Sequence, residues 1–168
     1  WRRVISDPFT ATGTTATLAL RTNIGTGDNT ALFDAITITS DVVPVIADGG
    51  FENPVQPVNN WEQANGVGGG DLTGSAWNIS GGAGITRNIS PFQNGGIPAP
   101  EGGQHALIQG TGSFEQTVSG FEVGAEYSLS LSTMARQGQN FGNDLEVILN
   151  EGLPSEIVLF DISEVTFN

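Results

Sequence analysis

The chain has 168 residues and a formal net charge of −13 at pH 7, with five arginines, no lysine, no cysteine and a single histidine. A single domain of this length buries roughly 70% of its unfolded surface around one core. The charge balance disfavours nucleic acid and insertion into anionic membranes, because both reward clustered basic residues. Without cysteine, neither disulfides nor thiolate metal sites are available, and no apolar run approaches the roughly 20 residues of a membrane span.

Glycine is abundant (24 residues) and charged residues are few (14%), which predicts an all-β module. Short segments alternate apolar and polar residues, as half-buried strands do. In chain order, strands are expected over about 1–9, 14–20, 31–39, 106–109, 114–118, 126–133, 144–150 and 156–160. Glycine and other turn residues predict long loops at 66–70 and 90–103. About eight to ten short strands of this kind indicate a jelly-roll β-sandwich.

The order of these segments is unusual. Residues 14–39 read as the closing hairpin of a sandwich, whereas residues 48–52 (DGGFE) read as the opening of one. We therefore expect residues 1–41 to be closing strands, 42–44 to be a linker, and residues 45–168 to be the opening and central strands. The strand order is rotated, so that the closing strands come first.

The two ends of the chain continue one strand pattern when they are joined. Val165, Phe167 and Trp1 then fall on alternate positions, with Asn168 between the last two. Three arrangements account for this pattern: a circularly permuted domain, a domain completed by a neighbouring unit, or a window of a tandem repeat. In the last two arrangements, Trp1, Phe167 and Asn168 form a seam between units.

Five segments carry a family pattern, and they follow family order only after this rotation. They are FENP (51–54), AWNISGGAGI (76–85), PEGGQHALIQ (100–109), GSFEQTV (112–118) and GDNTALFD (27–34). They resemble the galactose-binding-like jelly-roll repeats of secreted bacterial proteins, many of which carry a PEP-CTERM sorting tail. They are also similar to plant cell-wall jelly-roll proteins and, more remotely, to xylanase-associated carbohydrate-binding modules. The resemblance implies an extracellular or cell-surface protein, and it covers glycan binding, adhesion and scaffolding alike.

Asp34 is the sharpest candidate for a binding residue. It follows the alternation of residues 31–39, which places it on the core-facing side with Leu32, Ile36 and Ile38. A carboxylate in the core costs several kcal/mol unless it is paired. Because basic residues are so few, a bound cation is an attractive partner. The alternative is that Asp34 accepts hydrogen bonds from backbone N–H groups at a sheet edge.

The family resemblance suggests which cation this would be. The related carbohydrate-binding modules hold a structural calcium with the Glu of the opening Phe-Glu motif and an acidic residue of the closing strand. Those positions are Glu52 and Asp34 here. Backbone carbonyls near Gly103 and Gln104 would complete the oxygen shell that calcium prefers. The expected calcium ligands are therefore Asp34, Glu52 and the backbone of Gln104.

A weaker set of residues suits a sugar. Trp61, in a loop-like segment, is a candidate for an exposed stacking platform, with Gln93, Asn94 and Glu101 as polar contacts. Trp77 lies in a strand-like segment and is expected in the core.

No pattern of residues predicts an enzyme. The single histidine, His105, has no nucleophile-elbow sequence beside it and is expected to be structural. We therefore expect a non-catalytic structural or adhesive repeat unit of an extracellular filament, stalk or surface adhesin. Its partners would be copies of itself, joined by tandem repetition or strand exchange. The alternative is a carbohydrate-binding module that recognises cell-wall or extracellular polysaccharide.

Overall fold

The computed structural model describes residues 1–22, 29–41, 43–92, 97–136 and 144–162. All regular structure in these ranges is β-strand, and they contain no helix long and apolar enough to cross a membrane. The strands are β1 (Arg2–Ile5), β2 (Phe9–Thr10), β3 (Thr15–Thr22), β4 (Thr30–Thr39), β5 (Trp61–Gln63), β6 (Asn78–Arg87), β7 (Gln104–Ser119), β8 (Glu126–Ala135), β9 (Leu145–Leu149) and β10 (Ile157–Ile162).

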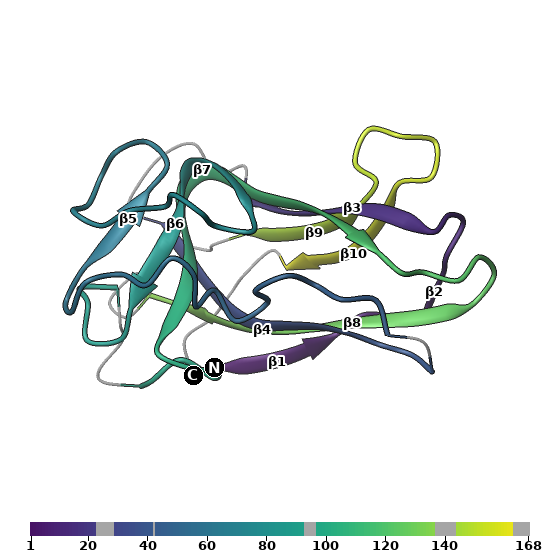
Figure 1. The fold of residues 1–168 in the computed structure, drawn as a ribbon, viewed down its shortest axis with the longest axis horizontal. Coiled ribbons are helices and arrows are strands. Elements are labelled where there is room, and N and C mark those ends of the chain that lie inside the picture. The colour runs from purple at the N-terminus through teal and green to yellow at the C-terminus, as the bar shows by residue number, and fades with distance from the viewer. Residues whose placement is uncertain (23–28, 42, 93–96, 137–143, 163–168) are drawn as a thin grey trace.

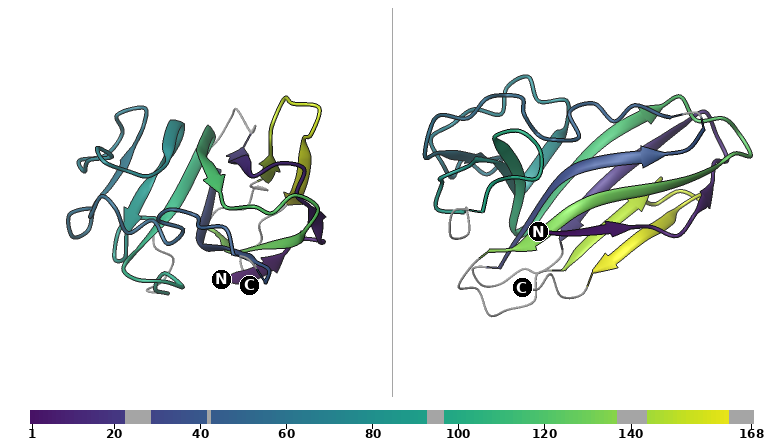
Figure 2. Two further views of the ribbon diagram at one scale, coloured as in Figure 1. Left: turned by 45° about the vertical axis from the view of Figure 1, so that its right-hand side comes forward. Right: turned by 90° about the horizontal axis from the view of Figure 1, so that it is seen from below.

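The strands form one antiparallel sheet that folds over into two packed layers (Figures 1 and 2). The strand order is β1-β8-β4-β7-β3-β9-β10, with β2 added to β8, and with β5 and β6 added along β7. The first half of β7 pairs with β4 and its second half pairs with β3, while β6 pairs with both halves, so β7 joins the two layers. The fold is an all-β sandwich of the jelly-roll type, as the sequence predicts.

Strand β7 depends on glycine where it bends from one layer to the other. Gly110 has a φ of 69°, in the left-handed region that favours glycine. On the neighbouring strand β6, a side chain at Gly82 would collide with the carbonyl group of Gln109. The segments 106–109 and 114–118, expected as separate strands, are therefore the two arms of one bent strand.

Two of the four N-terminal strands, β3 and β4, lie in the middle of the strand order. Strand β4 lies between β7 and β8, and β3 lies between β7 and β9. Within the described ranges, the strands of residues 1–39 thus pair with later strands of the same chain. Circular permutation and exchange with a neighbouring unit both stay predictions.

The main core is held by an aromatic cluster. Phe51, from the opening motif, contacts Phe33 of β4 edge-to-face with ring centroids 5.5 Å apart. It also stacks on Trp77 and meets Phe114 of β7, both at 5.3 Å. All four side chains are buried, which confirms the core position expected for Trp77. The opening segment is therefore packed against the closing strand.

A second, smaller apolar cluster lies outside the main core. Its buried members are Leu32, Phe92, Leu107 and Met134, and Trp1 and Trp61 pack against it. Neighbouring residues of β4 point into different clusters: Leu32 belongs to this second cluster, whereas Phe33 belongs to the main core.

A bulge in β4 corrects the predicted face of Asp34. Ala35 has a φ of 53°, and the pairing of β4 with β8 shifts register between Asp34 and Thr37. The extra residue reverses the alternation, so that Ile36 and Ile38 join Phe33 in the main core, whereas Leu32 does not. Asp34 is buried, but it does not share a face with Ile36 and Ile38.

Candidate functional site

The loop of residues 97–104, which leads into β7, binds both predicted calcium carboxylates. The N–H of Glu101 donates to Asp34 Oδ2 at 2.9 Å. The N–H groups of Gly103 and Gln104 both donate to Glu52 Oε1, also at 2.9 Å. One short loop therefore gathers carboxylates that lie far apart in the sequence.

A tight turn presents Glu52 to this loop. Asp48 and Phe51 have positive φ angles of 53° and 55°, and Asp48 Oδ1 accepts the Glu52 N–H at 2.7 Å. Such a φ is uncommon for a bulky residue, and here the buried ring of Phe51 holds the turn. On the other side, Gly102 (φ 58°) lies so close to the Glu52 carboxylate that a Cβ there would collide with it. Gly102 is therefore required for this approach.

Asp34 is electrostatically strained. It is fully buried, and its Oδ1 has no hydrogen-bond partner among the described residues. Burial raises the pKa of Asp34 to about 7; the N–H groups of Glu101 and Ala35 oppose the rise, and the charges of Glu101 and Glu52 add to it. The ion pairs within the described ranges all involve Arg21, on β3. No basic side chain in that part of the chain pairs with Asp34.

The side chains at this site offer oxygen atoms, which are the ligands that calcium prefers. Asp34, Glu52 and Glu101 offer carboxylate oxygens, and Asp34 Oδ1 is uncommitted. In the part of the chain that the structure describes, no three acidic, histidine or cysteine side chains are grouped closely enough to hold a metal by themselves. Because calcium takes roughly six to eight oxygens, main-chain carbonyls and water would have to complete its shell. Gln104, expected as a backbone ligand, reaches this group through its N–H.

The side chain of Gln104 has a role that sequence reasoning missed. It is buried, and its amide nitrogen donates to the carbonyl groups of Phe51 at 2.8 Å and Pro54 at 3.1 Å. Its amide oxygen accepts the N–H of Gln56. Gln104 thereby ties the opening segment to β7, and no local sequence pattern distinguishes it from a surface glutamine.

Two of the four predicted glycan contacts, Trp61 and Glu101, lie in the described part of the chain. Trp61 lies in strand β5, not in a loop, and is half-buried against Phe92, with ring centroids 5.3 Å apart. Glu101 lies over Gly50, beside Asp34. Gln93 and Asn94 lie outside the described residues. The short segment 61–63 forms a strand because it pairs with β6, a long-range contact that its own composition does not indicate.

An open depression beside β5 and β6 offers a different polar surface. Its lining includes Glu62, Asp71 and Asn78, together with Leu72 and Ile79. The two carboxylates hold turns of the same loop, since Glu62 accepts the N–H of Gly70 at 3.0 Å and Asp71 accepts that of Thr73 at 2.8 Å. The loop of residues 66–70, expected from the sequence, contributes Gly66 and Gly70 to this lining.

His105 is a packing residue in this structure. It is fully buried, and its ring meets that of Trp1 edge-on, with centroids 5.3 Å apart. Both ring nitrogens lack a partner within the described ranges, and burial lowers the pKa of His105 to about 3. The imidazole is therefore neutral and shielded from solvent at ordinary pH.

Trp1, which covers His105, is anchored to the loop of residues 97–104. Its indole N–H donates to the carbonyl group of Pro98 at 2.8 Å. Phe167 and Asn168, the other residues of the predicted seam, lie outside the described residues.

Among the described residues, one side of the sandwich ends in two edge strands, and this side is called the open side below. Within the described ranges, β1 pairs with β8 alone and β10 with β9 alone, which leaves one free edge on each. The two edge strands lie on the same side of the sandwich (Figure 2). Residues 2–5 and 160–162 line one groove. Ile5 on β1 is 62% exposed and Val158 on β10 is 52% exposed. The open side thus presents unpaired backbone groups together with apolar side chains.

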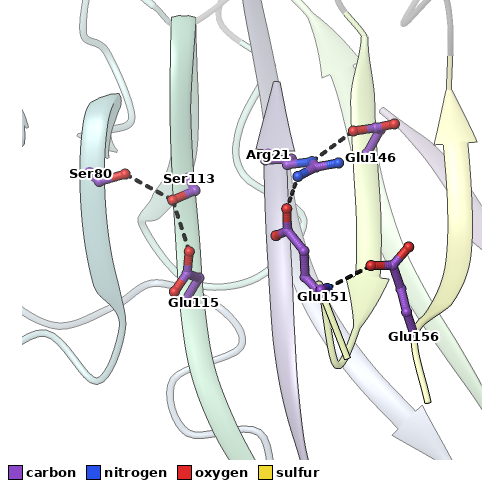
Figure 3. A network of polar contacts seen from close by, with 8 residues as sticks. Arg21, Ser80, Ser113, Glu115, Glu146, Glu151 and Glu156 are labelled. Carbon is purple, nitrogen blue, oxygen red and sulfur yellow. Dashed lines mark hydrogen bonds and ion pairs between the residues drawn. The ribbon is translucent and has the colours of Figure 1, made fainter. Parts of the chain in front are cut away.

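The outer face of β6, β7, β3 and β9 carries a polar network (Figure 3). Arg21 forms ion pairs with Glu146, at 2.8 Å, and with Glu151. On the neighbouring strands, the hydroxyl groups of Ser80 and Ser113 are 2.8 Å apart. Surface ion pairs of this kind contribute about 0–1 kcal/mol to the unfolding free energy. The network is therefore a minor source of stability.

No protein-family model matches this chain, and neither does any curated protein or solved structure. The likeness to galactose-binding-like repeats therefore rests on the sequence motifs, and function has to be argued from the geometry of this chain.

Proposed function

We propose that this chain is a non-catalytic structural or adhesive unit of an extracellular or cell-surface protein, and that it joins neighbouring units through its open side. The observation that carries the proposal is the pair of free edges on β1 and β10, which line one groove. Strand β10 (IVLFDI) has a single charge and neither lysine nor proline to block pairing. An exposed apolar edge of this kind is a template for another strand, and a neighbouring unit would cover it.

The positions of the titratable groups favour a binding protein over an enzyme. Catalysis needs groups of shifted pKa that converge in an accessible pocket. Among the described residues, the two groups with strongly shifted pKa values are Asp34 and His105, and both are fully buried. One lies under the loop of residues 97–104, and the other lies under Trp1.

The proposal takes the module to be of the galactose-binding-like type found in PEP-CTERM-type secreted proteins. The contact of Phe51 with Phe33 supports this assignment, because it packs the opening motif against the closing strand. We further propose that a structural calcium ion binds beside Asp34 and Glu52. A calcium ion would neutralise the carboxylates and fix the loop of residues 97–104, which also carries the acceptor for Trp1.

Calcium is expected to raise the melting temperature of the protein. At a concentration about 100-fold above the dissociation constant, it would add about 2.7 kcal/mol to the unfolding free energy. Asp34→Asn retains an acceptor for the Glu101 N–H but removes the charge, so its melt should not respond to calcium. Glu146→Gln, on the outer face, is the matched control and should keep the response. Identical circular-dichroism melts of the parent protein in calcium and in chelator would contradict the site.

The chain is expected to associate with itself in solution. Sedimentation over a range of concentrations should show masses above that of the monomer. Val158→Lys places a lysine on the β10 edge, which is how natural proteins block edge pairing, and should weaken association. Val123→Lys, at an exposed valine between β7 and β8, should leave association unchanged. A parent protein that stays monomeric at every concentration would contradict the proposal.

A carbohydrate-binding module is the second candidate function, and the depression lined by Glu62, Asp71 and Asn78 favours it. Affinity electrophoresis through gels that contain cell-wall polysaccharides tests it. Retardation that Asn78→Ala abolishes, in a monomeric protein, would support this function over the structural one.

A further inference from the structure

We propose that the open side binds a second copy of this chain, in a two-fold dimer in which β1 of each copy pairs with β10 of the other. The inference rests on the proposed function, because it names the occupant of the same groove. Three features of the open side point to this occupant: the charges on the two edges, the directions of the two strands, and the apolar side chains between them.

The charges on the two edges are opposite. Strand β1 carries Arg2 and Arg3, two of the five basic residues in a chain of net charge −13. Asp161 is the one charged residue of β10. Arg2 and Asp161 both line the groove, and neither forms an ion pair with another described residue. A β1–β10 contact between copies brings these charges together.

The other symmetric arrangement places like charges together. Pairing β1 with β1 would gather four arginines at one contact, and pairing β10 with β10 would bring two aspartates to the other. Like charges that face each other across strands or interfaces are unfavourable. The reciprocal β1–β10 arrangement avoids both repulsions.

The strand directions allow the reciprocal contact. Strands β1 and β10 flank the same side of the sandwich and run in opposite directions (Figures 1 and 2). A two-fold axis parallel to these strands, in the plane of the opening, places β1 of the second copy antiparallel to β10 of the first. The same rotation places the second β10 antiparallel to the first β1. One closed, symmetric contact thus pairs both free edges.

The contact also removes apolar surface from water. Val4, Phe160 and Ile162 line the groove and are only partly buried, although they pack against the main core. A second copy would cover them, together with the exposed side chain of Ile5. Burial of apolar area supplies the main favourable free energy of such an association.

Charge reversal tests the arrangement. Sedimentation equilibrium of the full chain should give a dimer whose dissociation constant rises about tenfold for Arg2→Glu and for Asp161→Arg, because each change turns two attractions into repulsions. The double variant, Arg2→Glu with Asp161→Arg, should recover the affinity of the parent. Thermal melts of the four proteins show that each is folded.

The alternative outcomes are distinguishable. If single reversals leave association unchanged or strengthen it, the like-with-like dimer is formed and the reciprocal one is overturned. If the parent associates and the double variant does not recover, the inference fails while the proposed function survives. If the parent is monomeric, both fail.

A proline variant tests the backbone pairing itself. Ser6 donates its N–H to Leu129 on β8, so the alternation along β1 turns the N–H of Ile5 away from β8, toward the open edge. Ile5→Pro removes that donor and leaves the pairing with β8 intact. A folded Ile5→Pro protein is expected to be monomeric, and one that dimerises like the parent would overturn the proposal.

Discussion

A chain that begins at Val45 is expected to lose cooperative folding, because residues 1–44 supply the middle strands of both layers. Their removal takes β4 from between β7 and β8, and β3 from between β7 and β9. It also removes large side chains that are fully buried: Leu18, Leu20, Leu32 and Phe33. Each such side chain is worth about 2–5 kcal/mol, so the loss matches or exceeds a typical total stability of about 5–15 kcal/mol. Circular dichroism of the truncated chain should show no cooperative thermal transition.

The matched control for truncation is a circular permutant that restores the same strands. Residues 45–168 would be followed by a glycine-serine linker and then by residues 1–41. Because β1 and β10 line one groove, a flexible linker can join the two ends, and the permutant should melt cooperatively like the parent. A truncated chain that folds without the first four strands would contradict the central role assigned to them. A permutant that fails to fold would contradict the rotated strand order.

The strands that sequence could predict are those whose own alternation records one buried face. Strands β3, β8 and β9 are of this kind. Strand β7 was expected as two strands, because the glycines at its bend read locally as a turn, and the continuity comes from pairing with β6. Strand β5 was missed for the same reason, since three residues hold a strand only through their partner. Alternation reports local burial, whereas bends and short strands are set by long-range pairing.

The candidate site was predictable in its residues more than in its geometry. The resemblance brought Asp34 and Glu52 together, and the structure binds both to the loop of residues 97–104. The bulge at Ala35 could not be foreseen, because the residue carries no mark of its positive φ. Glu101 was expected among the glycan contacts, yet its N–H binds Asp34. Such a contact depends on how a glycine-rich loop folds back, which no periodicity encodes.

The loop of residues 97–104 connects the two features that matter for the proposed function. At one end it binds Asp34 and Glu52, and at the other the carbonyl group of Pro98 holds the indole of Trp1. Trp1 leads directly into β1, an edge of the open side. A change in the charge of Asp34 or Glu52 can therefore reach β1 through this loop and Trp1. Strand β1 is one of the two strands through which copies of the chain are proposed to join.

The unfolding free energy of the calcium-free protein is expected to vary little between pH 3.8 and 6.5, because two buried groups act in opposite directions. Asp34 has a pKa raised from 3.8 to about 7, so its stabilising contribution is complete below pH 3.8 and is lost as the pH rises to about 7. His105 has a pKa lowered from 6.5 to about 3, so its contribution is complete above pH 6.5 and is lost as the pH falls to about 3. Between these limits the two pH dependences have equal size and opposite sign.

Single substitutions should uncover each dependence. In Asp34→Asn, the shifted pKa of His105 is no longer opposed by that of Asp34, and the unfolding free energy should fall by about 4 kcal/mol as the pH is lowered from 6.5 to 3.8. In His105→Leu, which fills the site beneath Trp1 with an apolar side chain, it should fall by a similar amount as the pH is raised over the same interval. Urea unfolding in chelator at a series of pH values measures all three proteins. Calcium, which binds the ionised carboxylate, should offset the loss at the upper end of the interval in His105→Leu, and it should leave the pH profile of Asp34→Asn unchanged. Three parallel pH profiles would show that neither group is held in the buried environment described here.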